Sequence, residues 1–309
     1  MSIRELLKKI LKNKSARVVY YLVRSIIKND FFGMASEMGF MLLAGFFTFL
    51  LFLMTLFGWL GKQPYMDSLL GVMSNLMPHA AMELIKMVLN QTMIFSHGKL
   101  VAIIGIIATL VLTANAVAVI LKGLNRTYKV EETRSFLYTR ILSFLLMLVD
   151  TLILFLTINI IIFGKVIVMF LVENFGLATN VAVIILTLRW LVAFLALYLM
   201  AFLSYYILPD LRGKESFKRK SALPGTAFFT SFWLLGSWGF SVYVNNFSTY
   251  NMLYGTLGAF FILMIWLYYT SIILLIGGEI NSRVYNNLEH RAGEIHEELK
   301  ALRKKTFNK

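Results

Sequence analysis

The sequence predicts an all-α integral membrane protein: a bundle of six transmembrane helices with an N-terminal amphipathic helix and an external helical hairpin. Hydrophobic residues make up 59% of the 309 positions and charged residues only 15%, whereas an ordinary soluble domain carries about a quarter charged residues. Six stretches with little or no charge are each long enough to cross roughly 30 Å of hydrocarbon as a helix. They lack the two-residue alternation of barrel strands, so helices are expected.

The chain begins with an amphipathic segment at residues 2–29. Its apolar residues form one helical stripe, while lysines and arginines fill the other face. This pattern indicates one or two interfacial helices on an anionic leaflet, and a helix packed under the bundle is the alternative. The stripe consists of Ile3, Leu6, Leu7, Ile10, Leu11, Val18, Val19, Leu22, Val23, Ile26 and Ile27.

The predicted spans follow in order. No charge occurs between Ser221 and Gly278, and this run is too long for a single helix. The polar cluster at 245–251 is typical of a turn and divides the run into two spans. The six spans are expected at residues 38–61, 100–121, 141–164, 180–207, 222–244 and 255–278.

Two further segments show helical patterns outside the spans. Apolar stripes in 62–99, interrupted by Pro78, predict an external helical hairpin. Its methionines are interpreted as adaptable packing, since they lack the clustered spacing of a soft-metal site. The tail at 283–305 repeats apolar residues among charges and predicts a cytoplasmic helix that is able to pair with a partner.

The positions of the basic residues predict the orientation. Eight Lys and Arg precede the first span, five lie in 122–140, five in 209–220 and seven after residue 278. By the positive-inside rule, both termini are cytoplasmic and the net charge of +14 reports topology. A nucleic-acid surface is disfavoured, because these residues flank spans and are not interleaved with stacking aromatics.

These features divide the chain into three parts and predict a multi-pass membrane protein. No cleavable signal peptide is expected, because the first apolar stretch starts past residue 30 and is too long. The parts are a cytoplasmic amphipathic segment at 1–35, a six-span membrane domain at 36–278 and a charged cytoplasmic tail at 279–309.

The sequence offers no recognisable catalytic set. There is no cysteine, and the four histidines divide between an external loop (His79, His97) and the tail (His290, His296). A metal nuclease needs clustered ligands, and no hydrolase or phosphate-loop signature occurs. We therefore expect no enzyme activity, no catalytic residue, no bound metal and no cofactor.

Two ionisable residues lie within the predicted spans, where charges are costly. Asp150 recurs at seven-residue spacing with Ser143, Thr157 and Gly164, which places these residues on one helical face. Arg189 lies in the next span beside small residues that permit close helix packing. We expect the two to pair, although simple counting offsets them by roughly 10 Å. A structural ion pair and a role in a substrate or proton relay are both open.

A second set of charges lies at the predicted cytoplasmic mouth. Glu279 ends the last span after Gly277 and Gly278, and Glu37 begins the first span. Both are within predicted reach of Arg126, Arg140 or Lys122. Interface anchoring and ion pairing is one interpretation; a gate or headgroup-binding cluster is the other. The double glycine permits close helix approach or a helix break.

Four segments resemble the YihY/BrkB family of bacterial inner-membrane proteins. They are LKGLNRTYKV (121–130), LPDLRGKESFKRKSALPG (208–225), YVNNFSTYNMLYGTLGAFF (243–261) and WLYYTSIILLIGGEIN (266–281). The resemblance covers nearly all six spans and implies an inner-membrane helical protein. The family once carried the label ribonuclease BN, and its members have been discussed as serum-resistance factors and as transporters of lipids or other envelope components.

The leading functional hypothesis is a transporter or flippase-like protein for a lipid or amphipathic envelope component. The alternative is a non-catalytic membrane scaffold for envelope-related partners, and a membrane enzyme is a third reading without a catalytic set. Membrane lipids are the expected partners. A second copy of the chain or another membrane protein is also open, whereas nucleic acid is not expected.

Overall fold

The computed structural model describes residues 14–59, 70–71, 74, 82–83, 85–87, 99–175, 179–211, 215–246 and 249–307. This part of the chain is helical and contains no strand, which confirms the predicted all-α class. The helices are α2 (Lys14–Lys28), α3 (Phe31–Trp59), α6 (Lys99–Tyr128), α7 (Phe136–Phe175), α8 (Thr179–Ile207), α9 (Glu215–Asn246) and α10 (Thr249–Phe307).

Local chemistry sets the ends of several helices. Between α2 and α3, Asp30 has a φ of 51°, and its Oδ1 accepts a hydrogen bond from the Gly33 N–H at 3.2 Å, capping α3. At the end of α6, Lys129 has a φ of 58°. The Lys129 and Val130 amides donate to the carbonyls of Arg126 and Asn125. This pattern is a Schellman cap, with lysine at the left-handed position that glycine usually occupies.

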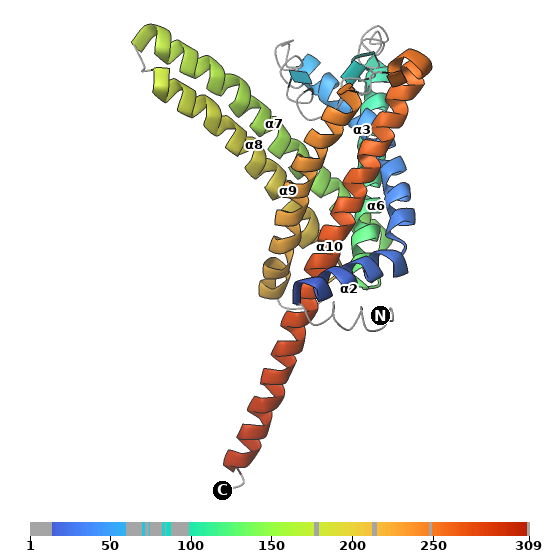
Figure 1. The fold of residues 1–309 in the computed structure, drawn as a ribbon, viewed down its shortest axis with the longest axis vertical. Helices are drawn as coiled ribbons and strands as arrows, with labels where there is room; N and C mark the ends of the chain where they lie inside the picture. The colour runs from blue at the N-terminus through green and yellow to red at the C-terminus, as the bar shows by residue number, and fades with distance from the viewer. Residues whose placement is uncertain are drawn as a thin grey trace, which may run out of the picture.

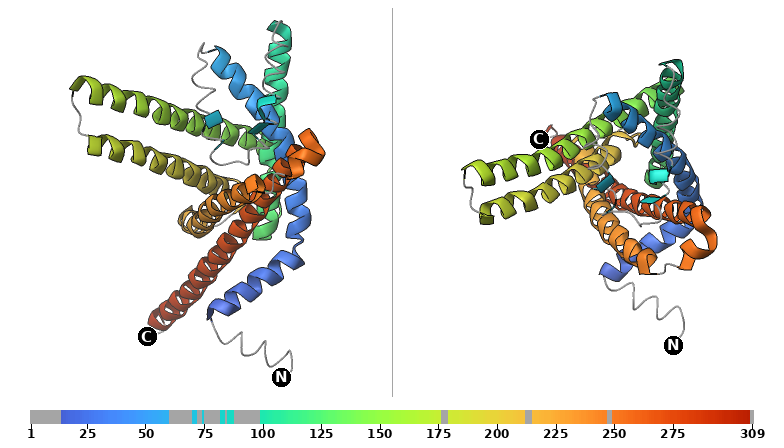
Figure 2. Two further views of the ribbon diagram at one scale, coloured as in Figure 1. Left: turned by 45° about the horizontal axis from the view of Figure 1, so that its top comes forward. Right: turned by 90° about the horizontal axis from the view of Figure 1, so that it is seen from above.

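Helix α10 is the centre of the bundle. It packs against α9, α3 and α6, and contacts α2 at one end. Helices α7 and α8 pair with each other as a hairpin, which joins the bundle through α6 and α9. The outer half of this hairpin diverges from the other helices in Figures 1 and 2. We call the end of the bundle where α2 lies the base; the last turns of α10 project from this end (Figure 1).

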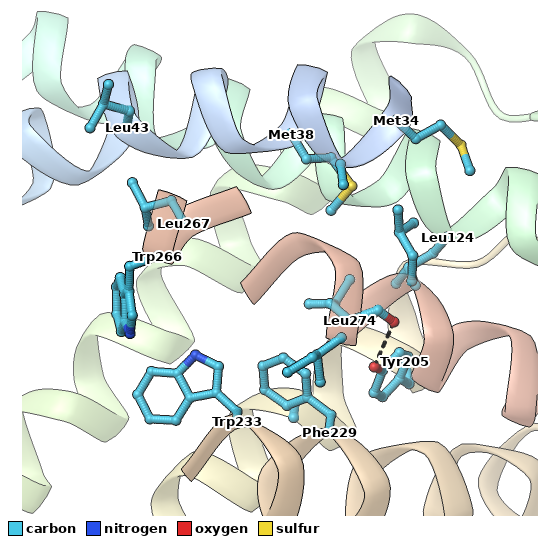
Figure 3. Packing of buried hydrophobic residues seen from close by; sticks show 14 of the residues in the cluster. Met34, Met38, Leu43, Leu124, Tyr205, Phe229, Trp233, Trp266, Leu267 and Leu274 are labelled. Atoms are coloured by element: carbon cyan, nitrogen blue, oxygen red, sulfur yellow. Dashed lines mark hydrogen bonds between the residues drawn. The ribbon is translucent and has the colours of Figure 1, made fainter. Parts of the chain in front are cut away.

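The core joins α10 to its neighbours by aromatic and hydroxyl contacts (Figure 3). The Trp233 and Trp266 rings lie 5.5 Å apart between α9 and α10. The Trp266 indole N–H donates to Ser237 Oγ at 3.1 Å. On α8, the Tyr205 hydroxyl donates to the Leu274 carbonyl at 2.8 Å. These bonds satisfy polar groups that would otherwise be buried without partners.

Among the residues that the structure describes, three helices carry apolar windows long enough to cross a membrane: Phe136–Thr157, Trp190–Ile207 and Phe260–Leu288. Inside the protein, 50% of the α10 window is buried, against 22% and 11% of the α7 and α8 windows. Those two helices therefore present most of their apolar surface outward, as lipid-facing helices do. In α3, the described side chains at Phe31–Phe46 form a further apolar stretch. The count of six spans stays a prediction.

Helix boundaries depart from the sequence expectation in three places. Helix α6 runs on to Tyr128 through the first part of the expected 122–140 loop. Helix α9 begins at Glu215, within the expected 209–220 loop. Helix α10 continues through the double glycine to Phe307 without a break, so the last span and the tail helix form one element. The predicted division at 245–251 agrees with the end of α9 and the start of α10.

The two predicted amphipathic segments are described only in part. Helix α2 crosses the base of the bundle (Figure 1). It buries Ser25 and exposes Val23 and Ile27; residues 2–13 lie outside the described chain. Most of the expected 62–99 hairpin also lies outside it, although Met82 and Ile85 belong to the buried core cluster.

Candidate functional site

A buried carboxylate of α10 lies near the base of the bundle. Glu279 is 3% exposed, and its Oε1 accepts hydrogen bonds from Arg283 Nε at 3.0 Å and Nη2 at 2.9 Å. Arg283 is one turn further along the helix and keeps part of its guanidinium in contact with solvent. The other carboxylate oxygen, Oε2, is buried and has no hydrogen-bond partner among the described side chains. Half of this charged group is therefore unsatisfied.

Asn281 compensates a break in the hydrogen bonding of α9. Pro224 lies inside that helix, where its ring disturbs the local helical hydrogen bonds. The next amide, Gly225 N–H, donates across to Asn281 Oδ1 on α10 at 2.6 Å. Asn281 is fully buried, and its Nδ2 has no partner among the described residues. The amide of Asn281 thus bridges two helices and retains unused donors.

Glycines allow the helices to approach closely around this bridge. A Cβ on Gly225 would overlap the carbonyl oxygen of Gly277, and a Cβ on Gly277 would overlap the Tyr205 hydroxyl. A Cβ on Gly278 would lie 2.7 Å from Thr127 Oγ1 on α6. The double glycine therefore serves close packing against three helices, and the break that the sequence also permitted does not occur.

Tyr128, the last residue of α6, completes the group. Its hydroxyl is buried and lies beside the Asn281 amide, but the two do not meet in hydrogen-bond geometry. Burial raises the pKa of Tyr128 far above its ordinary value, and the neighbouring Asn281 opposes this shift only in part. The phenol is therefore neutral at physiological pH.

We define the base cluster as Tyr128, Gly225, Glu279, Asn281 and Arg283. Its three unpartnered atoms are a phenol oxygen, a carboxylate oxygen and an amide nitrogen. The Tyr128 and Asn281 atoms lie together, whereas Glu279 is two residues before Asn281 and points to another face of α10. Buried polar atoms usually have partners, so each of these atoms is suited to an ordered water molecule or to a polar group of a bound molecule.

A charged network lies beside the base cluster. We call it the loop clamp, and it consists of Asn125, Glu132, Arg134, Leu208 and Asp210. Arg134 binds both carboxylate oxygens of Glu132 at 2.6 and 2.7 Å and donates to the Leu208 carbonyl at 2.7 Å. Asn125 donates to Glu132 at 2.7 Å and accepts from the Asp210 amide at 2.8 Å. The clamp therefore ties the end of α6 to the segment between α8 and α9.

The clamp also shifts the acidity of its members. Burial would raise the pKa of Glu132, but hydrogen bonds from Arg134 and Asn125 outweigh burial and hold that pKa below its ordinary value. The Glu132 carboxylate in turn raises the pKa of Arg134. An apolar contact of Tyr128, Leu211 and Tyr285 connects the clamp to the base cluster.

The residues predicted to lie together at the cytoplasmic mouth each contact a different partner in the structure. Glu37 pairs with Lys122 at 2.6 Å on the exposed surface between α3 and α6. Arg140 donates to Asn115 Oδ1, and its guanidinium lies 4.9 Å from the centre of the Phe136 ring. Arg126 is exposed at the end of α6. The described ion pair of Glu279 is with Arg283, so the structure does not join Glu279 to Arg126 or Arg140.

The polar face of α7 is directed inward. Ser143 and Thr157 are buried, while Leu145, Leu152 and Leu156 lie exposed on other faces. The Ser143 hydroxyl and Asp150 Oδ1 have no hydrogen-bond partner among the described side chains. The side chain of Arg189 lies outside the described residues, so its pairing with Asp150 stays a prediction.

Sequence reasoning did not single out the clamp residues or Asn281 and Tyr128 as site residues. A signal was present, because all of them except Glu132 and Arg134 fall within the four segments that carried the family resemblance. No group of three or more His, Asp or Glu side chains gathers in a metal-binding arrangement in the part of the chain that the structure describes.

Long apolar helices with outward-facing leucines, joined at one end by a buried polar cluster, define an integral membrane protein. The chain belongs to the Virulence factor BrkB family, which it matches over residues 22–301. This match confirms the resemblance inferred from the four sequence segments.

Similar proteins of known sequence agree with this family assignment. The ribonuclease-like protein YfkH of Bacillus subtilis (strain 168) is 31% identical over 251 residues, covering 81% of this chain and 89% of its own. A UPF0761 membrane protein of Pseudoalteromonas atlantica is 26% identical over 57% of this chain and 56% of its own. Another from Cronobacter sakazakii is 28% identical over 40% of this chain and 47% of its own. No solved structure matches the chain.

Proposed function

We propose that the protein moves a lipid or amphipathic envelope component across the inner membrane. The observation that carries this proposal is the inward polar face of α7. There, the hydroxyl of the buried Ser143 and the buried Oδ1 of the half-buried Asp150 have no hydrogen-bond partner among the described residues. Ionisable residues in spanning helices are costly and generally mark substrate or proton pathways.

The outward divergence of the α7–α8 hairpin supports the same proposal (Figures 1 and 2). A molecule with an apolar chain can keep that chain in lipid while its polar group passes along a polar helix face. In this scheme the Asp150 face contacts the polar group in mid-membrane. The base cluster then binds the polar group at the end of the bundle that the basic residues predict to be cytoplasmic.

The test is reconstitution in liposomes, following the movement of fluorescent phospholipids between leaflets. The wild-type protein should give flux above that of empty liposomes. Asp150→Asn and Glu279→Gln should reduce that flux while the helical circular-dichroism signal is retained. Glu131→Gln is the matched control, because Glu131 is an exposed carboxylate in the 129–135 loop at the base.

Two results would count against the proposal at different levels. Absence of wild-type flux across a broad panel of lipids would remove the support for lipid transport. Flux that neither Asp150→Asn nor Glu279→Gln changes would keep transport and overturn the assignment of these residues.

A second function, a membrane scaffold, is favoured by one observation. The C-terminal part of α10 continues as a helix beyond the bundle (Figure 1). Such a charged extension is suited to pairing with another helix. Truncation after Leu288 separates the two functions: a transporter should keep its lipid flux, whereas a scaffold should keep its fold and lose its cellular role.

A further inference from the structure

An apolar groove lies on the surface between α3 and α10. Its volume is about 160 Å³, and it is lined by Ser36, Gly39, Phe40, Phe261, Met264, Ile265 and Tyr268. A cavity of about 150 Å³ is enough to hold one benzene molecule. The groove therefore accommodates a stretch of roughly six carbon atoms of a hydrocarbon chain.

The walls of this groove suit a hydrocarbon chain better than water. Phe40, Phe261 and Ile265 are all more than half exposed, and both helices are apolar at this level. The Ser36 hydroxyl already donates to the Phe32 carbonyl at 2.9 Å. A stable water needs two to four polar partners, which these walls do not offer. Because the groove lies on a lipid-facing surface, an acyl chain is its natural occupant.

The groove leads to a basic corner of the protein. Phe32, Ser36 and Phe40 follow one another at four-residue intervals, so they share one face of α3. That face ends at the turn between α2 and α3. The exposed face of α2 at this corner combines Val23 and Ile27 with Arg24 and Lys28. Such a face is typical of helices that lie among anionic headgroups.

The charges at this corner leave the two cations available. Asp30 caps α3 through the Gly33 amide, and Glu37 pairs with Lys122. Arg24 and Lys28 form no ion pair with the side chains that the structure describes. The groove therefore lies on a face of α3 that leads toward the α2–α3 turn, and two cations without a described ion pair precede that turn on α2. This arrangement complements a chain bearing an anionic headgroup.

We propose that the groove between α3 and α10 is a binding site for an anionic phospholipid. One acyl chain lies along Phe40, Met264 and Ile265, and the phosphate headgroup contacts Arg24 and Lys28 of α2. Lipid tails are as apolar as the groove walls, so the walls alone do not select one lipid over another. Selectivity for the anionic lipid comes from the two cations.

This site goes beyond the proposed transport function and does not depend on it. A phospholipid bound here contacts the outer surface of α3 and α10, away from the polar face of α7. The experiment below requires no flux, so its failure and a failure of transport are distinguishable.

The experiment is photolabelling of the full-length protein in vesicles of phosphatidylglycerol and phosphatidylcholine. The probe is phosphatidylglycerol with a diazirine midway along one acyl chain, and phosphatidylcholine with the same chain serves for comparison. Mass spectrometry of peptides should place the phosphatidylglycerol label on residues 36–40 and 261–268. The phosphatidylglycerol probe should label these peptides more strongly than the phosphatidylcholine probe, by about fivefold for each engaged cation.

Paired variants test each half of the site. Ile265→Trp fills the groove and should abolish the localised label, while Leu235→Trp, at an exposed position on α9 (65% exposed), should leave it unchanged. The double change Arg24→Gln and Lys28→Gln should remove the preference for phosphatidylglycerol. The control Arg219→Gln with Lys220→Gln removes two exposed cations from α9 and should retain the preference for phosphatidylglycerol.

Mapping in the wild-type protein keeps the proposal falsifiable even if a variant fails to fold. A label spread evenly over the lipid-facing surfaces of α7, α8 and α10 would overturn the site. Equal labelling of residues 36–40 and 261–268 by the two probes would overturn the selection of anionic lipid by α2.

Discussion

Gly225 illustrates how strongly single residues constrain the helix contacts at the base. Its missing side chain lets the backbones of α9 and α10 approach, and its amide is held by Asn281. The same sequence contains Gly239 in the same helix, where a Cβ would meet no atom within 4 Å. The two glycines therefore have different physical roles, although both lie in the interior of one helix.

We expect Gly225→Ala to lower the free energy of unfolding by about 3 kcal/mol, because the added methyl group overlaps the Gly277 carbonyl oxygen. Gly239→Ala should stabilise the helix by about 0.5–1 kcal/mol, since alanine is the better helix former and nothing obstructs it. Thermal unfolding in detergent measures both variants. Equal effects of the two substitutions would contradict the close contact at Gly225.

The loop clamp predicts a dependence of stability on pH. The pKa of Glu132 in the folded protein lies below its ordinary value of 4.5. Its contribution to stability is therefore fully present above that value and is lost as the pH falls through the folded-state pKa. The melting temperature of the wild-type protein should fall more steeply below about pH 4.5 than that of Glu132→Gln.

Glu131→Gln is the control for this measurement. It removes the adjacent, exposed carboxylate of the same loop, so its melting temperature should follow the wild-type dependence on pH. If Glu132→Gln and wild type lose stability in parallel, the clamp does not supply the pH dependence.

At the scale of elements, α10 combines two roles that the sequence suggested were separate. A glycine pair, a glutamate and a polar tail are compatible with a helix end, yet α10 runs unbroken from Thr249 to Phe307. The glycines instead admit Tyr205 from α8 and Thr127 from α6. Packing partners outside the helix thus decide that it continues, because they fill the space that the glycines leave.

The α7–α8 hairpin carries the prediction that belongs to this scale. If Asp150 pairs with Arg189 across the two helices, either Asp150→Asn or Arg189→Gln should destabilise the protein by roughly 3 kcal/mol, because each strands a buried charge. The double variant should recover part of the loss. Melting temperatures of the two single variants and the double variant in detergent provide the thermodynamic cycle.

The control is the same cycle with Asp150→Asn and Arg140→Gln. Arg140 lies on α7 ten residues before Asp150, about 15 Å along the helix, and should show additive effects. Additive effects for the Asp150 and Arg189 cycle as well would remove the pairing.

At the scale of the whole molecule, α2 and the C-terminal part of α10 lie at one end of the bundle (Figure 1). The base cluster and the loop clamp lie on the elements that meet near this end. The distribution of Lys and Arg predicts that this end is cytoplasmic. Orientation in the membrane is a property of the entire chain, since it depends on charges that flank every span.

Single cysteines test this topology directly, because the chain contains no native cysteine. Ser68→Cys and Ser216→Cys should react with an impermeant thiol reagent from opposite sides of the membrane. Ser216, near the start of α9, should be accessible only from the cytoplasmic side. Reaction of both cysteines from the same side would contradict the predicted orientation.

The sequence by itself determined the helical membrane class, the family and the approximate helix positions. These properties follow from local rules: a run of about 20 apolar residues must be helical in lipid, and a polar cluster such as 245–251 ends it. The family segments also contained Asn125, Tyr128, Asp210 and Asn281 without indicating which of them meet.

Only the tertiary structure decided which charges and amides meet. Glu279 forms an ion pair with Arg283 on its own helix, and Glu37 forms one with Lys122. Asn281 accepts a hydrogen bond from the α9 amide that follows Pro224. The Glu279–Arg283 pair follows from i,i+4 spacing once α10 continues past the glycines. The two contacts between helices depend on how closely neighbouring helices approach and how they are rotated about their axes. Side chains packed from distant parts of the chain set that geometry, and helical periodicity within a single segment does not contain it.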